Sequence, residues 1–583
     1  MPRPDRTKLG PTVRITHSSL INFLVIAGFG LLVYKFARTR ILDLPLWQES
    51  PVVASRNLFE EKCLKFRPQL LNSKLEVIEY LEAGNRASLK HRDLTCGGPA
   101  ESQAVSQDIC RIALYVETSA ISGIHLEAWI PRSWNSRFLG IGNGGLNGCL
   151  DYASLVYGTS HGFVALASNN GHNGTKGLPF YDNPEVLHDF ADRAIHVSAL
   201  AGKAITRQFH GVEDFNSYFL GCSQGGRQGI ANAMKFPNDY DGVVAGAPAL
   251  DFNSLVSWRA SFYPLTGSDD SSEFISSKKW SNLIHDEVLR QCDDLDGVRD
   301  GIIEYPDLCD FKPEVLLCKP DTPDVNLCLS TAQVKQVQQI FSPYTHSDGS
   351  LIYPGMQVGS EQQAVDRLYS GKPFTDSEDW FKYVVHADPQ WDPAMYTTDD
   401  ARKAQKLNPF DIRTYPSHHD LIEFRKKGGK LLVYHGMQDQ QITGHNTARW
   451  FDYMQSQGAS MDDLDEWARY FRISGLLHCS GGPGAWMVGQ TGGSVGFEPK
   501  KNVLAAIVSW VEEGAAPEEL EGTKLFEGLP FGGGGSPRVE FTRRHCRYPK
   551  RNRYVGPSLE RRARHNIQNN APRSSVATEW ICV

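Results

Sequence analysis

The sequence of 583 residues predicts an α/β fold in which a long insertion divides the chain that builds the central sheet. Short apolar runs alternate with helical stretches between residues 137 and 250, and this alternation is typical of parallel strands joined by helices. After Leu250 the chain becomes turn-rich and carries many aromatic residues and cysteines. The alternation returns at residues 426–442, so strands from both sides of the insertion are expected in one sheet.

The individual elements follow from local patterns. Apolar runs bounded by turn residues predict strands at residues 113–119, 124–131, 137–141, 162–168, 218–222 and 241–249. Residues 185–209 carry apolar side chains at three- to four-residue spacing, which predicts a helix.

Shifts in composition divide the chain into five expected segments. They are residues 1–50 as a signal or membrane-anchor region, 51–250 as the first part of the sheet domain, 251–425 as an inserted lid, 426–530 as the second part of the sheet domain, and 531–583 as a C-terminal extension.

Composition limits the classes of function. The formal net charge of −7 gives no sign of nucleic-acid binding. Twelve cysteines in paired-looking groups indicate an oxidising compartment, and the alternative is a set of free thiols in a cytosolic enzyme.

The N-terminal region supports export from the cytosol. Residues 20–36 form an apolar run preceded by four basic residues, so a cleaved signal peptide or a single transmembrane anchor is expected rather than a buried core helix. The protein is then secreted, or extracellular and attached to a membrane through this segment. Asn173 begins the sequon "NGT", an acceptor for N-glycosylation in that pathway.

A candidate nucleophile lies in "GCSQG", residues 221–225, which matches G-x-S-x-G. The motif follows an expected strand and opens an expected helix, the position of the nucleophile elbow in the α/β-hydrolase fold. Ser223 would then project above the sheet at a helix N-terminus, where negative charge is favoured. The alternative is an ordinary polar residue in a glycine-rich turn.

Activation of a serine hydroxyl requires a base, and in this fold an acid and then a histidine follow the serine along the chain. Asp439 comes just after an expected strand, and His478 lies in a later glycine-rich loop. Asp439 can instead cap a turn, and His435 and His445 can be ordinary polar residues.

Two cysteines adjoin the two candidates. Cys222 precedes Ser223 and Cys479 follows His478. A disulfide between them would hold their Cα atoms roughly 4.4 to 6.8 Å apart and would bring serine and histidine together.

The segments "GCSQGGRQG", "HGMQD" and "HCSGGPGAW" together resemble the fungal and bacterial tannase and feruloyl esterase family. The resemblance runs from about residue 55 to the C-terminus. It implies Ser223 as acyl-enzyme nucleophile, His478 as general base and acid, and Asp439 as the carboxylate that orients the histidine. It also implies an α/β-hydrolase fold with a large inserted lid.

An oxyanion hole is expected beside the serine. The residue after the nucleophile supplies one backbone N–H in this fold, which assigns Gln224. The glycine loop at residues 143–145 is expected to supply the second, and we assign Gly144 within it.

The acidic loop "CDDLDGVRDGII", residues 292–303, is dense in hard oxygen ligands suited to Ca²⁺, although it is not an EF-hand. The alternative is a solvated acidic turn. The family resemblance implies a structural Ca²⁺ bound by Asp293, Asp296 and Asp300 and by backbone oxygens of Val298 and Ile302. It also implies five further disulfides, Cys63–Cys110, Cys96–Cys149, Cys292–Cys309, Cys318–Cys328 and Cys546–Cys582.

The sequence therefore predicts a serine carboxylic ester hydrolase that cleaves feruloyl or galloyl esters, either small phenolic esters or feruloylated polysaccharide. The alternative, from another class, is a catalytically inactive hydrolase fold that serves as a binding module at the cell surface. Aromatic residues of the lid are candidates for a phenol pocket or for its core; they are Trp258, Phe262, Trp280, Trp380, Phe381 and Trp391.

Overall fold

The computed structural model describes residues 51–96, 101–321, 323–490, 496–526, 538–556 and 580–583. The chain divides into two compact units, residues 1–62 and 63–583. Helix α2 (Pro51–Lys65) crosses this division, and the remaining elements belong to the second unit. The predicted signal or anchor segment, residues 20–36, lies outside the described residues.

A nine-stranded sheet forms the centre of the second unit, in the order β1-β4-β5-β7-β6-β8-β9-β12-β13. Its strands are β1 (Ser73–Leu81), β4 (Ile109–Glu117), β5 (Gly123–Pro131), β6 (Arg137–Ile141), β7 (Val164–Ser168), β8 (Asn216–Cys222), β9 (Gly242–Gly246), β12 (Lys430–Gly436) and β13 (Ala468–Ile473). Each strand expected from the sequence corresponds to one of these.

The sheet is mixed rather than parallel throughout. Strands β7, β6, β8, β9, β12 and β13 run parallel to their neighbours among these six, whereas the pairs β1–β4, β4–β5 and β5–β7 are antiparallel. The connection between β4 and β5, residues 118–122, is too short for a parallel crossover, so these two strands can pair only in the antiparallel direction.

Helices cover both faces of the sheet. Alternate residues of a strand point to opposite faces. On one face Leu139, Tyr218 and Val244 share a hydrophobic cluster with residues of α3 (Tyr152–Ser160) and α16 (Val503–Glu513). On the other, Gly202 of α5 (Ala194–His210) and Gly229 of α6 (Gln224–Lys235) let these helices approach Phe138 and Phe219 closely.

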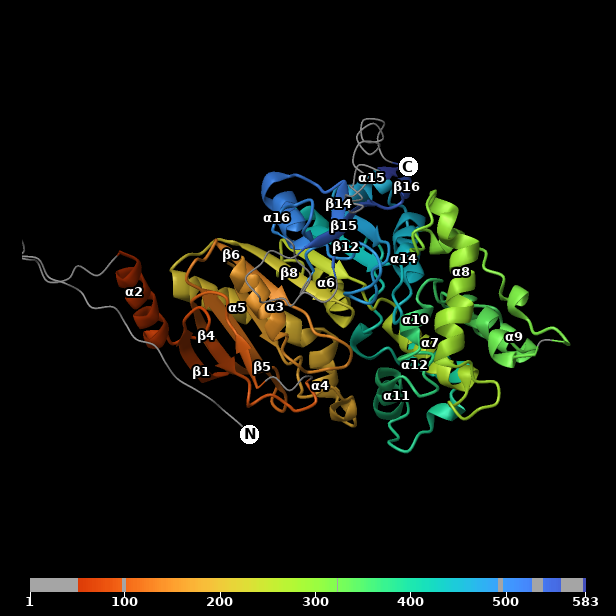
Figure 1. The fold of residues 1–583 in the computed structure, drawn as a ribbon. Helices are drawn as coiled ribbons and strands as arrows, with labels where there is room; N and C mark the ends of the chain where they lie inside the picture. The colour runs from red at the N-terminus through yellow and green to blue at the C-terminus, as the bar shows by residue number, and fades with distance from the viewer. Residues whose placement is uncertain (1–50, 97–100, 322, 491–495, 527–537, 557–579) are drawn as a thin grey trace, which may run out of the picture. The chain divides into compact units, whose positions relative to one another are not determined.

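The insertion, residues 247–429, lies between β9 and β12, which are hydrogen-bonded neighbours in the sheet. We call it the lid. Figure 1 shows its helices α7 to α12 lying together, away from β1, β4 and β5. Its helices and strands are α7 (Phe252–Thr266), α8 (His285–Cys292), α9 (Thr331–Phe341), β10 (Tyr344–Thr345), β11 (Leu351–Tyr353), α10 (Glu361–Ala364), α11 (Thr375–Trp380), α12 (Thr398–Leu407) and α13 (Ile422–Lys426).

The lid has a hydrophobic core of its own. Buried lid side chains pack together with residues 180–191 in a cluster separate from the one on the sheet. The aromatic candidates Trp258, Phe262, Trp280, Trp380 and Phe381 belong to this core, and Trp391 packs against it. None of these six lines the cavity described below, so they stabilise the lid rather than form a phenol pocket.

Shorter elements complete the second unit. They are β2 (Arg86–Ser88), β3 (Ser102–Ala104), α4 (Pro184–His188), α14 (Gly444–Ser456), α15 (Met461–Asp465), β14 (Glu519–Leu525), β15 (Val539–Cys546), β16 (Asn552–Tyr554) and β17 (Trp580–Cys582).

All twelve cysteines form disulfides, and all six expected pairs are present. The free-thiol alternative is therefore wrong. Asn173 of the sequon is exposed. Within the described part of the chain, no helix has the length and apolarity that a membrane crossing requires.

Candidate active site

Ser223 occupies a strained turn between β8 and α6. Its backbone φ of 63° and ψ of −122° lie in a region that residues with a side chain rarely adopt. The turn needs its flanking glycines, because a Cβ atom on Gly221 would lie 2.5 Å from the backbone of Gly225. One on Gly225 would lie 3.1 Å from the carbonyl oxygen of Asn143. This is the geometry of a nucleophile elbow.

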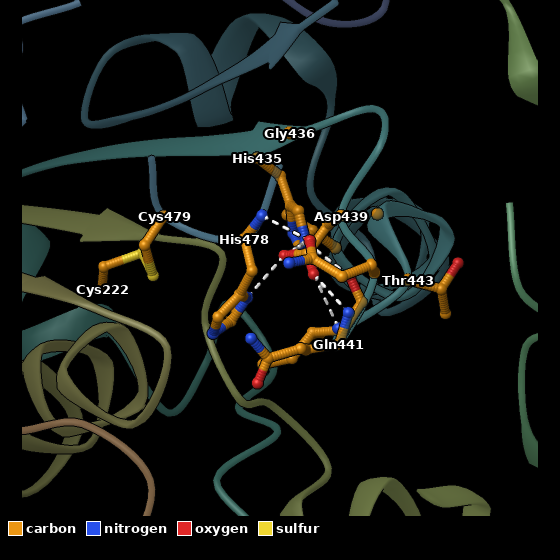
Figure 2. A network of polar contacts seen from close by, with 12 residues as sticks. Cys222, His435, Gly436, Asp439, Gln441, Thr443, His478 and Cys479 are labelled. Atoms are coloured by element: carbon orange, nitrogen blue, oxygen red, sulfur yellow. Dashed lines mark hydrogen bonds and ion pairs between the residues drawn. A yellow bond between two sulfur atoms is a disulfide. The ribbon is translucent and has the colours of Figure 1, made fainter. Parts of the chain in front are cut away.

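Asp439 and His478 form the expected acid and histidine pair (Figure 2). Asp439 follows β12 and is fully buried. Nδ1 of His478 lies 2.8 Å from Oδ2 of Asp439 and donates a hydrogen bond to it. The other carboxylate oxygen, Oδ1, accepts from the backbone N–H groups of Gln441 and Ile442, each at 2.8 Å. The proton on Nδ1 leaves Nε2 of His478 free to accept a proton from another group.

A second histidine shares the carboxylate. Nε2 of His435 lies 3.2 Å from Oδ2 of Asp439 and 2.9 Å from the carbonyl oxygen of Ile442. Both neighbours are acceptors, so Nε2 of His435 carries the proton, and Nδ1 lies 2.8 Å from the hydroxyl oxygen of Thr447. His435 is thus a partner of the candidate acid and not an ordinary polar residue.

The surroundings of Asp439 favour its ionised form. Burial alone would raise the pKa of this carboxyl, but the charge that His478 can carry and the hydrogen bonds from His435 and His478 outweigh burial and lower the pKa. The candidate acid therefore remains a carboxylate at any pH near neutrality.

The lid also holds the loop of Asp439. Nε2 of Gln357, a fully buried lid residue, donates to the carbonyl oxygen of Asp439 at 3.0 Å. Its Oε1 accepts from the hydroxyl of Thr443 at 2.9 Å and from the backbone N–H of Gly444. No sequence pattern indicated this residue, because a glutamine in a turn-rich segment has no distinctive signature.

The disulfide Cys222–Cys479 joins the serine turn to the histidine loop, with a Cα–Cα distance of 5.9 Å across 257 residues of sequence (Figure 2). Ser223 and His478 line one cavity of about 650 Å³. No direct hydrogen bond joins Ser223 to His478 in the described structure. Such contacts often form fully only when substrate is bound.

The two expected oxyanion residues come from different segments, Gln224 directly after the serine and Gly144 in the glycine loop. The N–H of Gln224 belongs to the first residue of α6, where no helical carbonyl faces it. In the glycine loop, the N–H of Asn143 already donates to Oε1 of Gln228 at 2.9 Å. Gly144 lines the cavity and remains the better candidate for the second donor.

In the acidic loop of the lid, the aspartate side chains bind protein N–H groups and an arginine and do not form a closed metal site. The carboxylate of Asp293 accepts from the backbone N–H groups of Gly301 and Ile302, at 3.0 and 3.2 Å, and Asp300 pairs with Arg543. Oδ1 of Asp296 accepts from the N–H of Val298, whereas its Oδ2 is buried without a hydrogen-bond partner. Burial, together with the nearby carboxylates of Glu304 and Asp300, raises the pKa of Asp296 to about 7.

Across the described ranges, no three His, Cys, Asp or Glu side chains are grouped closely enough to hold a metal ion. The unpartnered oxygen of Asp296 is the one feature of this loop that fits a bound cation.

The fold, the turn at Ser223 and the pair of Asp439 and His478 together define a protein of the α/β-hydrolase class. A family model described as tannase and feruloyl esterase matches residues 110–567. The chain belongs to this family, and it is a carboxylic ester hydrolase. The alternative of an inactive binding module is set aside.

Similar proteins agree with this assignment. "Probable feruloyl esterase B-2" of Aspergillus flavus is 51% identical over 497 residues, which cover 84% of this chain and 93% of that protein. The crystal structure of feruloyl esterase B from Aspergillus oryzae is 42% identical, with a TM-score of 0.83, and covers 90% of this chain and 100% of its own. Tannin acyl hydrolase from Aspergillus niger, at 19% identity and a TM-score of 0.67, shares the fold.

Proposed function

We propose that this protein hydrolyses feruloyl esters through a covalent acyl-enzyme on Ser223. Relatives that are 42 to 51% identical carry the name feruloyl esterase B, whereas the tannin acyl hydrolase is much more distant. This difference favours feruloyl over galloyl esters. The substrate is a small phenolic ester or a feruloylated polysaccharide.

The reaction begins when Nε2 of His478 accepts the proton of the Ser223 hydroxyl and the serine oxygen attacks the ester carbonyl. Asp439 keeps the imidazole in the required tautomer and stabilises its protonated form. The backbone N–H groups of Gln224 and Gly144 stabilise the oxyanion. His478 then gives its proton to the leaving alcohol, and a water activated by the same imidazole hydrolyses the acyl-enzyme.

The observation that carries this proposal is the 2.8 Å hydrogen bond between His478 and Asp439. The loop of His478 is joined to the Ser223 turn by the Cys222–Cys479 disulfide. The test is a hydrolysis panel of methyl ferulate, methyl caffeate and methyl gallate with wild type and Ser223→Ala. We expect the wild type to hydrolyse the ferulate faster than the gallate. We expect the alanine variant to keep its melting temperature and lose turnover; equal turnover in both would remove Ser223 from the reaction.

We further propose that the protein acts outside the cytosol, either secreted or attached through residues 20–36. Six disulfides support an oxidising compartment, and exposed Asn173 is available for glycosylation.

A structural Ca²⁺ in the acidic loop is also proposed. The carboxylates of Asp293, Asp296 and Asp300 would bind the ion together with backbone oxygens of Val298 and Ile302. The supporting observation is the buried Oδ2 of Asp296, which lacks a partner that a cation would provide. The loop does not line the cavity, so the ion would stabilise the lid and take no part in the chemistry.

A further inference from the structure

The cavity that contains Ser223 also contains a buried guanidinium. Arg259 of α7 is 6% exposed and lines the cavity. Its Nε donates to the carbonyl oxygen of Gln441 at 2.9 Å, and its guanidinium carbon lies 4.7 Å from the ring centroid of Phe374. No carboxylate of the described chain forms an ion pair with it. A buried charge in this position is costly unless a ligand completes its hydrogen bonds.

An opposite charge lines the same cavity. Asp376 of α11 is half-buried and makes no hydrogen bond or ion pair with any described residue. Its carboxylate lies against the glycine loop, because a Cβ atom on Gly145 would be 2.7 Å from Oδ2 of Asp376. Burial raises the pKa of Asp376, and the positive charge of Arg259 opposes that shift.

The two charges lie near each other in the cavity, but they contact different loops. Arg259 donates a hydrogen bond to the carbonyl oxygen of Gln441, and the backbone N–H of Gln441 donates to the carboxylate of Asp439. Asp376 instead lies beside Gly145 of the candidate oxyanion loop. They influence each other electrostatically but are too far apart to form an ion pair. One side of the cavity thus offers N–H donors, and another offers a carboxylate acceptor.

A ligand that satisfies both must carry a donor and an acceptor close together. Two adjacent oxygen substituents do so: a hydroxyl donates to the carboxylate, and its neighbour, a hydroxyl or a methoxyl, accepts from the guanidinium. A lone anion would satisfy the arginine and be repelled by the aspartate. The 3,4-oxygenated ring of a phenolic acid and a sugar diol of the leaving alcohol both have the required chemistry.

We propose that Asp376 and Arg259 form a subsite that recognises a pair of adjacent oxygen substituents on the substrate. This inference rests on the proposed function and adds the determinant of substrate choice within it. A site built to hydrogen-bond such groups discriminates strongly against analogues that lack them, because its polar groups are then left unpaired.

The test compares methyl caffeate, which has two adjacent ring hydroxyls, with methyl cinnamate, which has none. We expect Asp376→Asn to lower kcat/KM for the caffeate by about 10- to 100-fold, the effect of a lost hydrogen bond to a charged group. The cinnamate should change by less than about threefold. Arg259→Lys keeps the positive charge but loses the planar set of N–H donors of the guanidinium. We expect it to lower kcat/KM for the caffeate selectively, as Asp376→Asn does.

A second pair of substrates identifies the source of the oxygens. Methyl ferulate carries no sugar, whereas a feruloylated arabinose carries the sugar as its leaving group. A selective loss with the arabinose ester assigns the pair of oxygens to the sugar, and a selective loss for caffeate over cinnamate assigns it to the ring.

The matched control is Asp366→Asn, which removes the same charge from an exposed lid position outside the cavity lining. Melting temperatures establish that each variant is folded. If both Asp376→Asn and Arg259→Lys change every substrate by one factor, or change none, the subsite proposal is overturned. Failure of the wild type to hydrolyse any of the four esters would instead overturn the proposed function.

Discussion

Nε2 of His435 lies 3.2 Å from the same oxygen of Asp439 that Nδ1 of His478 approaches to 2.8 Å. One carboxylate oxygen therefore receives two imidazole N–H groups in a fully buried environment (Figure 2). His435 makes no contact with the cavity, so it acts on the reaction only through the position and charge of Asp439.

Replacement of this second histidine tests its role as a positioning residue. We expect His435→Asn to lower kcat by about 10- to 100-fold with little change in KM, because a hydrogen bond to a buried charge is lost. The hydrogen bond from His435 lowers the pKa of Asp439, so its loss should raise that pKa and move the acidic limb of the kcat/KM profile to higher pH.

Thr447→Val offers a milder companion variant, since it removes only the hydroxyl that faces Nδ1 of His435. Its kcat should fall between those of wild type and His435→Asn. An unchanged kcat and an unchanged pH profile in His435→Asn would show that the histidine only fills space.

The Cys222–Cys479 disulfide should matter for turnover as well as for stability. Removal of a bond that closes a loop of 257 residues costs about 5.5 kcal/mol in the chain-entropy model. We expect the double variant Cys222→Ala, Cys479→Ala to lose at least tenfold in kcat at a temperature where it is still folded, because the histidine loop is no longer held to the serine turn.

The Cys318–Cys328 disulfide provides the control, since it closes a short loop and neither cysteine lines the cavity. Its removal should lower the melting temperature and leave kcat unchanged. Full activity of the Cys222→Ala, Cys479→Ala protein would mean that other contacts position His478.

The lowered pKa of Asp439 predicts a pH-dependent effect on stability. A carboxyl with a folded-state pKa below its usual value of 3.8 stabilises the fold above that value, and this contribution is lost as the pH falls toward the folded-state pKa. Asp439→Asn should therefore cost about 2 kcal/mol of unfolding free energy at pH 6 and less at pH 3.

Urea denaturation at the two pH values measures the difference. The exposed Asp366→Asn variant should show no comparable dependence on pH. A deficit for Asp439→Asn that is as large at pH 3 as at pH 6 would contradict the assignment of a charge-stabilised carboxylate.

Chelation tests the proposed calcium site. Treatment with EGTA should lower the melting temperature of the wild type, and added Ca²⁺ should restore it, because the buried oxygen of Asp296 would regain a partner. In Asp296→Asn the response to EGTA should disappear. The kcat at 25 °C should be unchanged both by EGTA treatment and by Asp296→Asn. A wild type whose melting temperature does not respond to EGTA would contradict the calcium site and favour a solvated acidic turn.

Much of this architecture was predictable because it follows from short-range patterns. The strands, the insertion and the serine turn all have local signatures, and the two cysteines next to Ser223 and His478 linked distant loops. The antiparallel strands at one edge were not predicted, since the direction of a strand depends on the path of its connections.

The residues that the sequence did not reveal act through distant contacts. His435 and Gln357 acquire their roles only when β12 and the lid meet around Asp439. Arg259 and Asp376 belong to two lid helices that are more than a hundred residues apart in sequence, and their common cavity appears only in the folded chain. The lid aromatics were candidates for a pocket because composition alone does not separate core from lining.

The insertion between β9 and β12 has a consequence for synthesis of the protein. Gly246 ends one strand and Lys430 begins its neighbour, so a chain emerging from the ribosome cannot complete its sheet until the whole lid has been made. The nucleophile is translated early, whereas the acid and the histidine come more than two hundred residues later. In the proposed mechanism, a nascent or prematurely terminated chain therefore carries an unactivated serine, and hydrolysis can begin only after His478 has been made.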